Sequence, residues 1–164
     1  MVDAALNGDI YLAPATVVES VPNQFVTFTC GSRAFGVDIM SVREIRSSSP
    51  TTELPNQPFG AKGVLDIRGS IVQVYDLEIM LGGLRQSRDS NIGQVVLVVS
   101  LESEDVGMLV DTVSDIIFAR PDDLRPVPKS SADSSGGMVS GLVKNEDRLI
   151  GVLNLDALFP QAVA

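Results

Sequence analysis

The sequence predicts an all-β fold, either a sandwich or one or two small barrels. Many short runs rich in Val and Ile are separated by Gly, Pro, Asn, Asp and Ser, and no long stretch has the 3.6-residue period of an amphipathic helix. The 164 residues suit one domain or a pair of interlocked subdomains. Because aromatic residues make up only 5% of the chain, the core must depend on aliphatic side chains.

The first predicted strand is residues 24–30, where Val26, Phe28 and Cys30 share one face. Gly31 and Ser32 form a turn into a second strand, residues 34–39. One helical turn over 40–43 and an extended segment over 44–46 follow.

The central block runs from Leu54 to Gly82. It contains two predicted strands, 64–67 and 71–75, joined by Arg68-Gly69-Ser70. Gly69 permits a positive φ at this reversal. Arg68 therefore projects beside the turn, where its guanidinium needs acceptors. A short helix over 77–81 ends at Gly82.

The remaining strands continue to the C-terminus. Residues 94–101 are apolar on both faces, which predicts a strand buried on both sides. Pro121–Lys129 is predicted to be irregular, 130–137 a solvated loop, and Asp156 the cap of a last helical turn. The other predicted strands are 106–110, 113–118, 139–144 and 149–155. The total is about nine or ten short strands.

Composition excludes several classes of function. The net charge is −9 and no Lys/Arg cluster is present, which argues against binding to nucleic acid or to anionic lipid. Cys30 is the one cysteine, so no internal disulfide forms; it is either a core side chain or a reactive thiol. No run reaches the roughly 18 apolar residues that span a bilayer. Residues 1–22 lack signal-peptide features and are predicted to be a flexible tail that docks on the domain or stays disordered.

The mean hydropathy of +0.24 is high for a protein of this size. It indicates either apolar surface used for partners or a Val-rich β core.

The sequence carries no recognisable catalytic set. Histidine is absent, and no phosphate-binding glycine loop occurs, so no cofactor or metal is predicted. Leu109–Thr112 resembles the start of an aspartic protease site, but Val113 stands where such sites have Gly. The alternative is that Asp111 accepts turn N–H groups at a strand end. The acidic pairs lack the ligand spacing of a calcium loop.

A chain with many short strands and no catalytic set is better read as a binding module. Four segments in order resemble the CheW family, the coupling proteins of bacterial chemosensory arrays, over about residues 24–160. They are FGVDIMSVREI (35–45), the central block (54–82), VGMLVDTVSDI (106–116) and DRLIGVLNLDALF (147–159).

The resemblance implies two interlocked small SH3-like five-stranded β-barrels with a shared core and short helical turns, within a domain spanning 23–160. It implies a non-enzymatic adaptor that couples chemoreceptor cytoplasmic tips to the regulatory domain of a CheA-type histidine kinase. Such a protein is cytoplasmic, is recruited to membrane receptor arrays, and is able to self-associate there. The alternatives are a free-standing β-barrel that binds a ligand or peptide, and a CheW-like adaptor in a system with non-flagellar output.

The resemblance also assigns site residues by position. Each has an alternative role: a groove valine such as Val42 is either a receptor anchor or a core residue, and the kinase-contact loop either touches the kinase or only crosses the barrel. Glu44 is expected to pair with Arg68, with a receptor residue or with water. The receptor-binding groove comprises Ile39, Val42, Glu44, Val95, Val96, Val113 and Ile116; the kinase contact Asn56, Pro58, Lys62 and Gly63; the joint between barrels Arg68 and Gly69.

Three positions depart from what is frequent in the family. Asp66 stands in place of Asn, Gln73 in place of Pro, and Glu78 in place of Arg. The last reverses a charge on a face expected to be exposed, which favours a change of partner over a change of stability.

Overall fold

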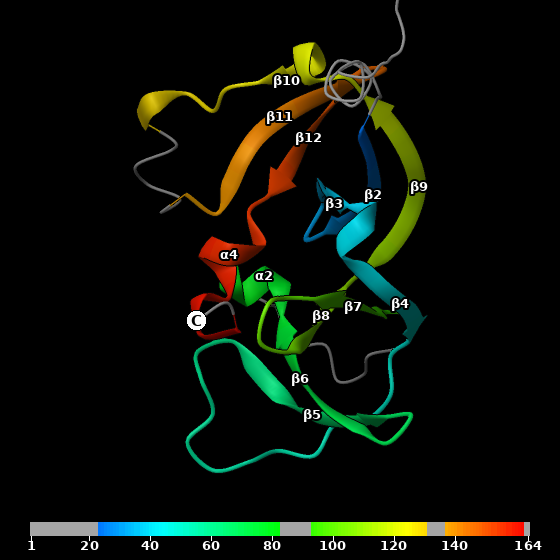
Figure 1. Ribbon diagram of the computed structural model, residues 1–164, viewed down its shortest axis with the longest axis vertical. Helices are drawn as coiled ribbons and strands as arrows, with labels where there is room; N and C mark the ends of the chain where they lie inside the picture. The colour runs from blue at the N-terminus through cyan, green and yellow to red at the C-terminus, as the bar shows by residue number, and fades with distance from the viewer. Residues whose placement is uncertain (1–22, 83–92, 131–136, 163–164) are drawn as a thin grey trace, which may run out of the picture.

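Two sheets that share a core make up the protein (Figure 1). The computed structural model describes residues 23–82, 93–130 and 137–162. The predicted tail, residues 1–22, lies outside the described residues.

The first sheet has five strands in the order β4-β7-β8-β6-β5. Strands β6 and β8 run parallel and the other neighbours run antiparallel. The strands are β4 (Val42–Ser47), β5 (Ala61–Ile67), β6 (Ser70–Asp76), β7 (Val95–Ser100) and β8 (Asp105–Val110).

The second sheet has six strands in the order β10-β11-β12-β3-β2-β9. Only β12 and β3 are parallel neighbours. The strands are β2 (Asn23–Cys30), β3 (Arg33–Asp38), β9 (Thr112–Ala119), β10 (Leu124–Arg125), β11 (Val139–Asn145) and β12 (Arg148–Leu153).

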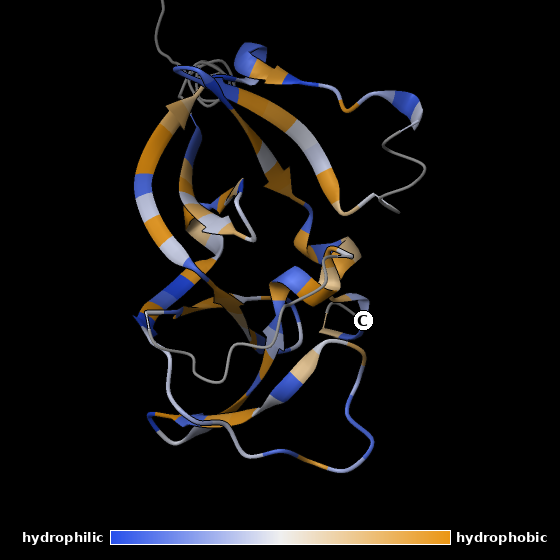
Figure 2. Ribbon diagram, turned by 180° about the vertical axis from the view of Figure 1, so that it is seen from behind, coloured by the Kyte–Doolittle hydropathy of each residue, from blue (hydrophilic) through white to orange (hydrophobic). Residues whose placement is uncertain are grey.

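The largest apolar cluster joins the two sheets and draws side chains from both. We call it the shared core; it includes Phe28, Cys30 and Val37 from the six-stranded sheet, and Leu97 and Met108 from the five-stranded sheet. Figure 2 shows the apolar residues distributed along strands of both sheets. A second cluster lies inside the five-stranded sheet and a third inside the six-stranded sheet. Branched side chains are buried on both faces of β7 and β8, and this burial stabilises the packing of the two sheets against each other.

Short helical turns connect the strands and close the shared core. Leu77 in α2 is fully buried, and Leu158 and Phe159 at the C-terminus also pack in the shared core. The turns are η1 (Ile39–Ser41), α2 (Leu77–Met80), η2 (Pro121–Asp123), α4 (Leu155–Leu158) and η3 (Pro160–Ala162).

The predicted all-β fold, with two interlocked barrel-like halves and a shared core, is confirmed. Cys30 is fully buried, as a core side chain. The segment predicted to be irregular, Pro121–Lys129, contains η2 and the two-residue β10, which gives the second sheet its sixth strand. Asn154, not Asp156, caps α4: its side chain accepts a hydrogen bond from Ala157 N at 3.3 Å, because the last strand ends at Leu153.

Candidate functional site

Four residues of the predicted receptor groove border the shared core that joins the two sheets. Ile39, Val42, Val95 and Val113 come from η1, β4, β7 and β9, and all four are partly buried against the shared core. They therefore form an apolar rim contributed by both sheets. We call these four residues the rim. Ile116 lies on β9 and is 53% exposed.

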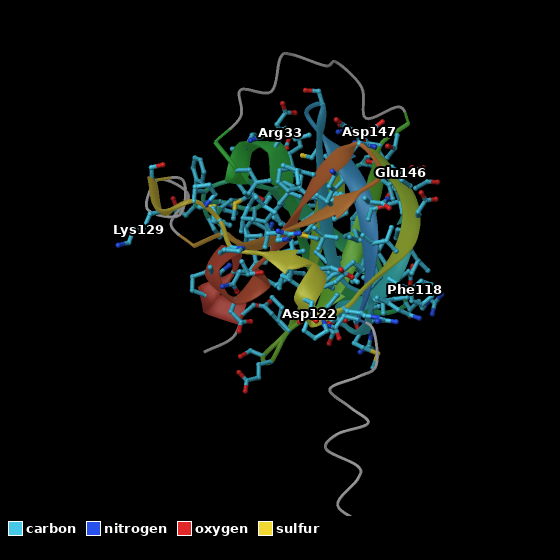
Figure 3. The ribbon with its side chains drawn as sticks, turned by 90° about the horizontal axis from the view of Figure 1, so that it is seen from above. Arg33, Phe118, Asp122, Lys129, Glu146 and Asp147 are labelled. Atoms are coloured by element: carbon cyan, nitrogen blue, oxygen red, sulfur yellow. The ribbon has the colours of Figure 1, made fainter. Side chains whose placement is uncertain are left out.

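Two exposed apolar side chains on the elements that carry Ile39 and Val113 were not predicted. Met40 follows Ile39 in η1 and is 86% exposed, and Phe118 projects outward near the end of β9 (Figure 3). Alternation along 113–118 places Ile116 and Phe118 on the same face, so the pattern could have indicated Phe118.

Val96 does not belong to the groove, which corrects the prediction. It is 1% exposed and packs inside the five-stranded sheet with Val98 and Leu109. Successive side chains of a strand point to opposite faces, so Val95 and Val96 cannot both face the rim. The run is apolar on both faces, which hides this distinction in the sequence.

Glu44 and Arg68 form an ion pair, one of the partnerships expected for Glu44. A guanidinium nitrogen of Arg68 lies 3.5 Å from Glu44 Oε1, and Arg46 approaches the other oxygen at 3.6 Å. The Arg68 side chain is 83% exposed. Glu44 is on β4 and Arg68 is at the β5–β6 turn, which are opposite edges of one sheet.

The placement of Arg68 and Gly69 at the joint between barrels is therefore wrong. The pair braces the five-stranded sheet across its own open end. It lines a polar hollow of about 410 Å³, where Arg43 also pairs with Asp105 at 3.4 Å. The hollow is lined by Arg43, Glu44, Ile67, Arg68, Ser70, Val72, Val98 and Asp105.

The hairpin that presents Arg68 is held by Asp66. Asp66 Oδ1 accepts a hydrogen bond from Gly69 N at 2.9 Å, across a turn where Arg68 has φ 54° and Gly69 φ 86°. Either Asp or Asn can accept this bond, so the departure at position 66 preserves the turn.

The other two departures also make contacts within the chain. Gln73 Nε2 donates to Gly63 O at 2.7 Å. The Glu78 carboxylate lies over the Gly31 turn, where a Cβ on Gly31 would stand 2.6 Å from its Oε2. Glu78 is half-buried, so the expectation of an exposed face is corrected.

The predicted kinase contact is only partly at the surface. Asn56 and Pro58 are exposed and Lys62 is half-buried. Gly63 is buried beneath Thr51 and Thr52 at φ 145°, so it shapes the loop and offers no surface. Phe59, 75% exposed, was missed. An aromatic residue in a Pro- and Gly-containing loop is the signal that could have found it.

The joint between the sheets is instead made around Asp111, which stands between β8 and β9. Its Oδ2 accepts from Gly31 N at 2.8 Å and its Oδ1 accepts from Gln94 Nε2 at 3.3 Å. Its own N–H donates to Thr29 O at 2.9 Å. This confirms the interpretation of Asp111 as a strand-end acceptor; Gln94 was not predicted.

The pKa of the Tyr75 hydroxyl departs from its ordinary value. Burial raises the pKa of the Tyr75 hydroxyl, opposed by a hydrogen bond from Gln161 Nε2 at 2.9 Å; the charge of Glu104 raises it further. The ring packs on Phe159 in the shared core. The hydroxyl is a structural contact to η3.

The residues that the structure describes hold no group of three or more metal-ligating side chains. Among the same residues, no helix has both the length and the apolar character needed to cross a membrane.

The fold and site define a class: a binding module whose two β-sheets present apolar and charged surfaces around a shared core. Residues 24–163 match the family of CheW-like domains, and the chain belongs to this family. CheW is a family of scaffold proteins in chemotaxis and not of enzymes.

Relatives and a solved structure agree with this assignment. The chain is 34% identical to chemotaxis protein CheW of Rhizobium meliloti, covering 84% of this chain and 87% of that one. It is 32% identical to chemotaxis protein CheW of Klebsiella aerogenes, over 85% of this chain and 83% of that one. The crystal structure of scaffolding protein TtCheW from Thermoanaerobacter tengcongensis superposes with a TM-score of 0.74 at 26% identity, covering 84% of this chain and 92% of that one.

Proposed function

We propose that this protein is an adaptor that couples the cytoplasmic tips of chemoreceptors to the regulatory domain of a CheA-type histidine kinase. The domain that does so is residues 23–160, in the cytoplasm, at membrane receptor arrays. The observation that carries the proposal is the rim. Four apolar residues from η1 and both sheets are only partly buried against the shared core, and Ile116 and Met40 are exposed on β9 and η1.

A receptor tip is a helical hairpin, and an apolar face of a helix fits a groove of this kind. Aliphatic anchors surrounded by charged groups are typical of modest, reversible interfaces. Glu44 provides such a charged group, since β4 carries both Val42 and Glu44. The ion pair with Arg68 fixes the orientation of that carboxylate.

The kinase contact is proposed at the loop that precedes β5. Asn56, Pro58 and Phe59 are exposed there, and Lys62 is half-buried. The loop bends sharply, with Asn56 at φ 53° and Gly60 at φ 83°, and Ala61 N closes a bond to Pro58 O at 3.0 Å. A loop held in this way presents Phe59 with little ordering cost on binding.

No observation favours a non-flagellar output or a free-standing ligand-binding role. Asp66, Gln73 and Glu78, the departures that suggested a different partner, contact Gly69, Gly63 and Gly31 of the same chain. Their chemistry serves the fold at these positions.

The test is reconstitution of kinase activity with receptor-containing membranes, with and without this protein. Receptor-dependent phosphorylation is expected only when the protein is present. Binding to the isolated kinase regulatory domain, measured by calorimetry, is expected at roughly micromolar affinity. Kinase control that is independent of the protein would contradict the proposal. Specific stabilisation by a small ligand, without kinase contact, would favour the free-standing module.

A further inference from the structure

Asp111 links the two sheets beside Val95 and Val113 of the rim, and Gln94 holds the Asp111 carboxylate from the five-stranded sheet. Gln94 immediately precedes β7 of the five-stranded sheet, and Asp111 is the single residue between β8 and β9. Asp111 accepts from Gln94 Nε2 and, through its second oxygen, from Gly31 N in the β2–β3 turn of the six-stranded sheet. We call Gln94, Asp111 and Gly31 the clasp.

Hydrogen bonding determines which atom of the Gln94 side-chain amide faces Asp111. A carboxylate only accepts hydrogen bonds, so the Nε2 side must face Asp111. The opposite atom, Oε1, is then buried without a hydrogen-bond partner in the structure, in a side chain from a residue that is 4% exposed. An apolar side chain of similar length would avoid this unsatisfied oxygen. The role that the structure gives this amide is the bond from its Nε2 to the Asp111 carboxylate.

The neighbours of the clasp indicate what it does. Val95 follows Gln94 directly, and Val113 lies two residues after Asp111. Both belong to the rim, and they come from opposite sheets. The bond between Gln94 and Asp111 continues the β7–β8 pairing beyond Val95 and Val110, and the bond from Gly31 N to Asp111 crosses from there to the six-stranded sheet.

A third contact supports the clasp from the α2 side. The Glu78 carboxylate fills the space over Gly31, which has φ 58° and no side chain. The β2–β3 turn is therefore held between α2, which follows the five-stranded sheet, and Asp111.

We propose that Gln94 and Asp111 are positioning residues for receptor binding: the clasp fixes the separation of the two sheets at the rim, so that a receptor helix meets Val95 and Val113 at the correct spacing. This inference rests on the proposed function. It assigns no contact between the clasp and the receptor.

The test uses the full chain carrying Gln94→Met. Methionine is close to glutamine in length, removes the bond to Asp111, and also removes the unsatisfied oxygen, so the melting temperature stays within a few degrees. Affinity for a soluble chemoreceptor helical hairpin is expected to fall about fivefold or more. Affinity for the kinase regulatory domain is expected to stay within about twofold, because neither hydrogen bond of the clasp involves a residue of the Asn56–Lys62 loop.

Gln73→Met is the matched control. Its amide also donates one hydrogen bond, but to Gly63 O inside the five-stranded sheet. Receptor affinity is not expected to change. Asp111→Asn is the conservative variant: its oxygen can still accept from Gly31 N and its nitrogen can donate to a rotated Gln94, so receptor affinity is retained. Alanine at position 111 can form neither of these side-chain hydrogen bonds. Asp111→Ala is therefore expected to lose at least as much receptor affinity as Gln94→Met.

A structural readout separates this inference from the proposed function. Spin labels on Ile71→Cys and Lys144→Cys, both exposed and on different sheets, report the distance between the halves. Gln94→Met is expected to broaden that distance distribution, and Gln73→Met to leave it unchanged. An unchanged distribution in Gln94→Met, or a broadened one with full receptor affinity, overturns the inference. Failure of the unmodified protein to bind the receptor instead overturns the proposed function.

Discussion

At the scale of single residues, burial and hydrogen bonding separate side chains that the sequence places together. Val95 and Val96 are adjacent and chemically identical, yet one borders the rim and the other fills the five-stranded sheet. Glu44 and Arg68 are charged and partly or largely exposed, so their pairing contributes little to folding. Their value lies in orienting one carboxylate beside Val42.

Arg68→Ala is therefore expected to leave the melting temperature within a few degrees, because exposed ion pairs contribute about 0–1 kcal/mol. Receptor-dependent assembly with the kinase is expected to weaken, measured by co-sedimentation with receptor membranes. The exchange Glu44→Arg with Arg68→Glu serves as a control, since it keeps the pair and alters the charge shown to the receptor. Unfolding of Arg68→Ala, with normal affinity of the folded fraction, would leave bracing as the only role.

Tyr75 makes stability depend on alkaline pH. Its folded-state pKa is raised above 10.0, so the unfolded state loses its phenolic proton first. The stability contribution is complete below pH 10 and is lost as the pH rises through the folded-state pKa. Tyr75→Phe is expected to flatten this part of a denaturation-versus-pH curve, while losing the bond from Gln161 at neutral pH. An identical alkaline slope in both proteins would show that another group is responsible.

At the scale of elements, short turns decide how the strands are connected. The four-residue α4 depends on its cap, because a helix of this length has few internal bonds. Asn154 Oδ1 accepts from Ala157 N, and Asn154 O accepts from Ala157 N and Leu158 N. This turn places Leu158 and Phe159 in the shared core.

Asn154→Ala is expected to lower the free energy of unfolding by about 1 kcal/mol, measured by urea denaturation. Asp156→Ala, in the first turn but not at the cap, is the comparison and is expected to cost less. Equal losses from the two substitutions would mean that charge near the helix start, and not the cap, stabilises α4.

The positions of the strands could be predicted from the sequence more readily than the face of the sheet that each side chain occupies. Alternation over 24–30 predicted the inward face of β2, and the doubly apolar run over 94–101 predicted a strand buried on both sides. Because this run is apolar on both faces, its sequence does not show whether Val95 or Val96 faces the rim. The sequence also could not reveal that Gln94 meets Asp111, since that bond depends on the pairing register of β7 and β8, in which Val95 is opposite Val110. The two-residue β10 is too short to leave a periodic signal.

At the scale of the whole molecule, both sheets contribute residues to the rim, the surface proposed to bind the receptor. The rim takes residues from both sheets, the shared core lies directly behind it, and the clasp lies at the same joint. The proposed kinase loop belongs to the five-stranded sheet alone, between β4 and β5. The geometry therefore supports two partners binding at separate places.

The most direct measurement of this claim is calorimetric titration of the kinase regulatory domain into the protein, alone and after saturation with a chemoreceptor helical hairpin. One-to-one binding is expected in both titrations, with dissociation constants within about threefold of each other. Loss of kinase binding in the receptor-saturated sample would show that the two partners compete for one surface, and would contradict the account.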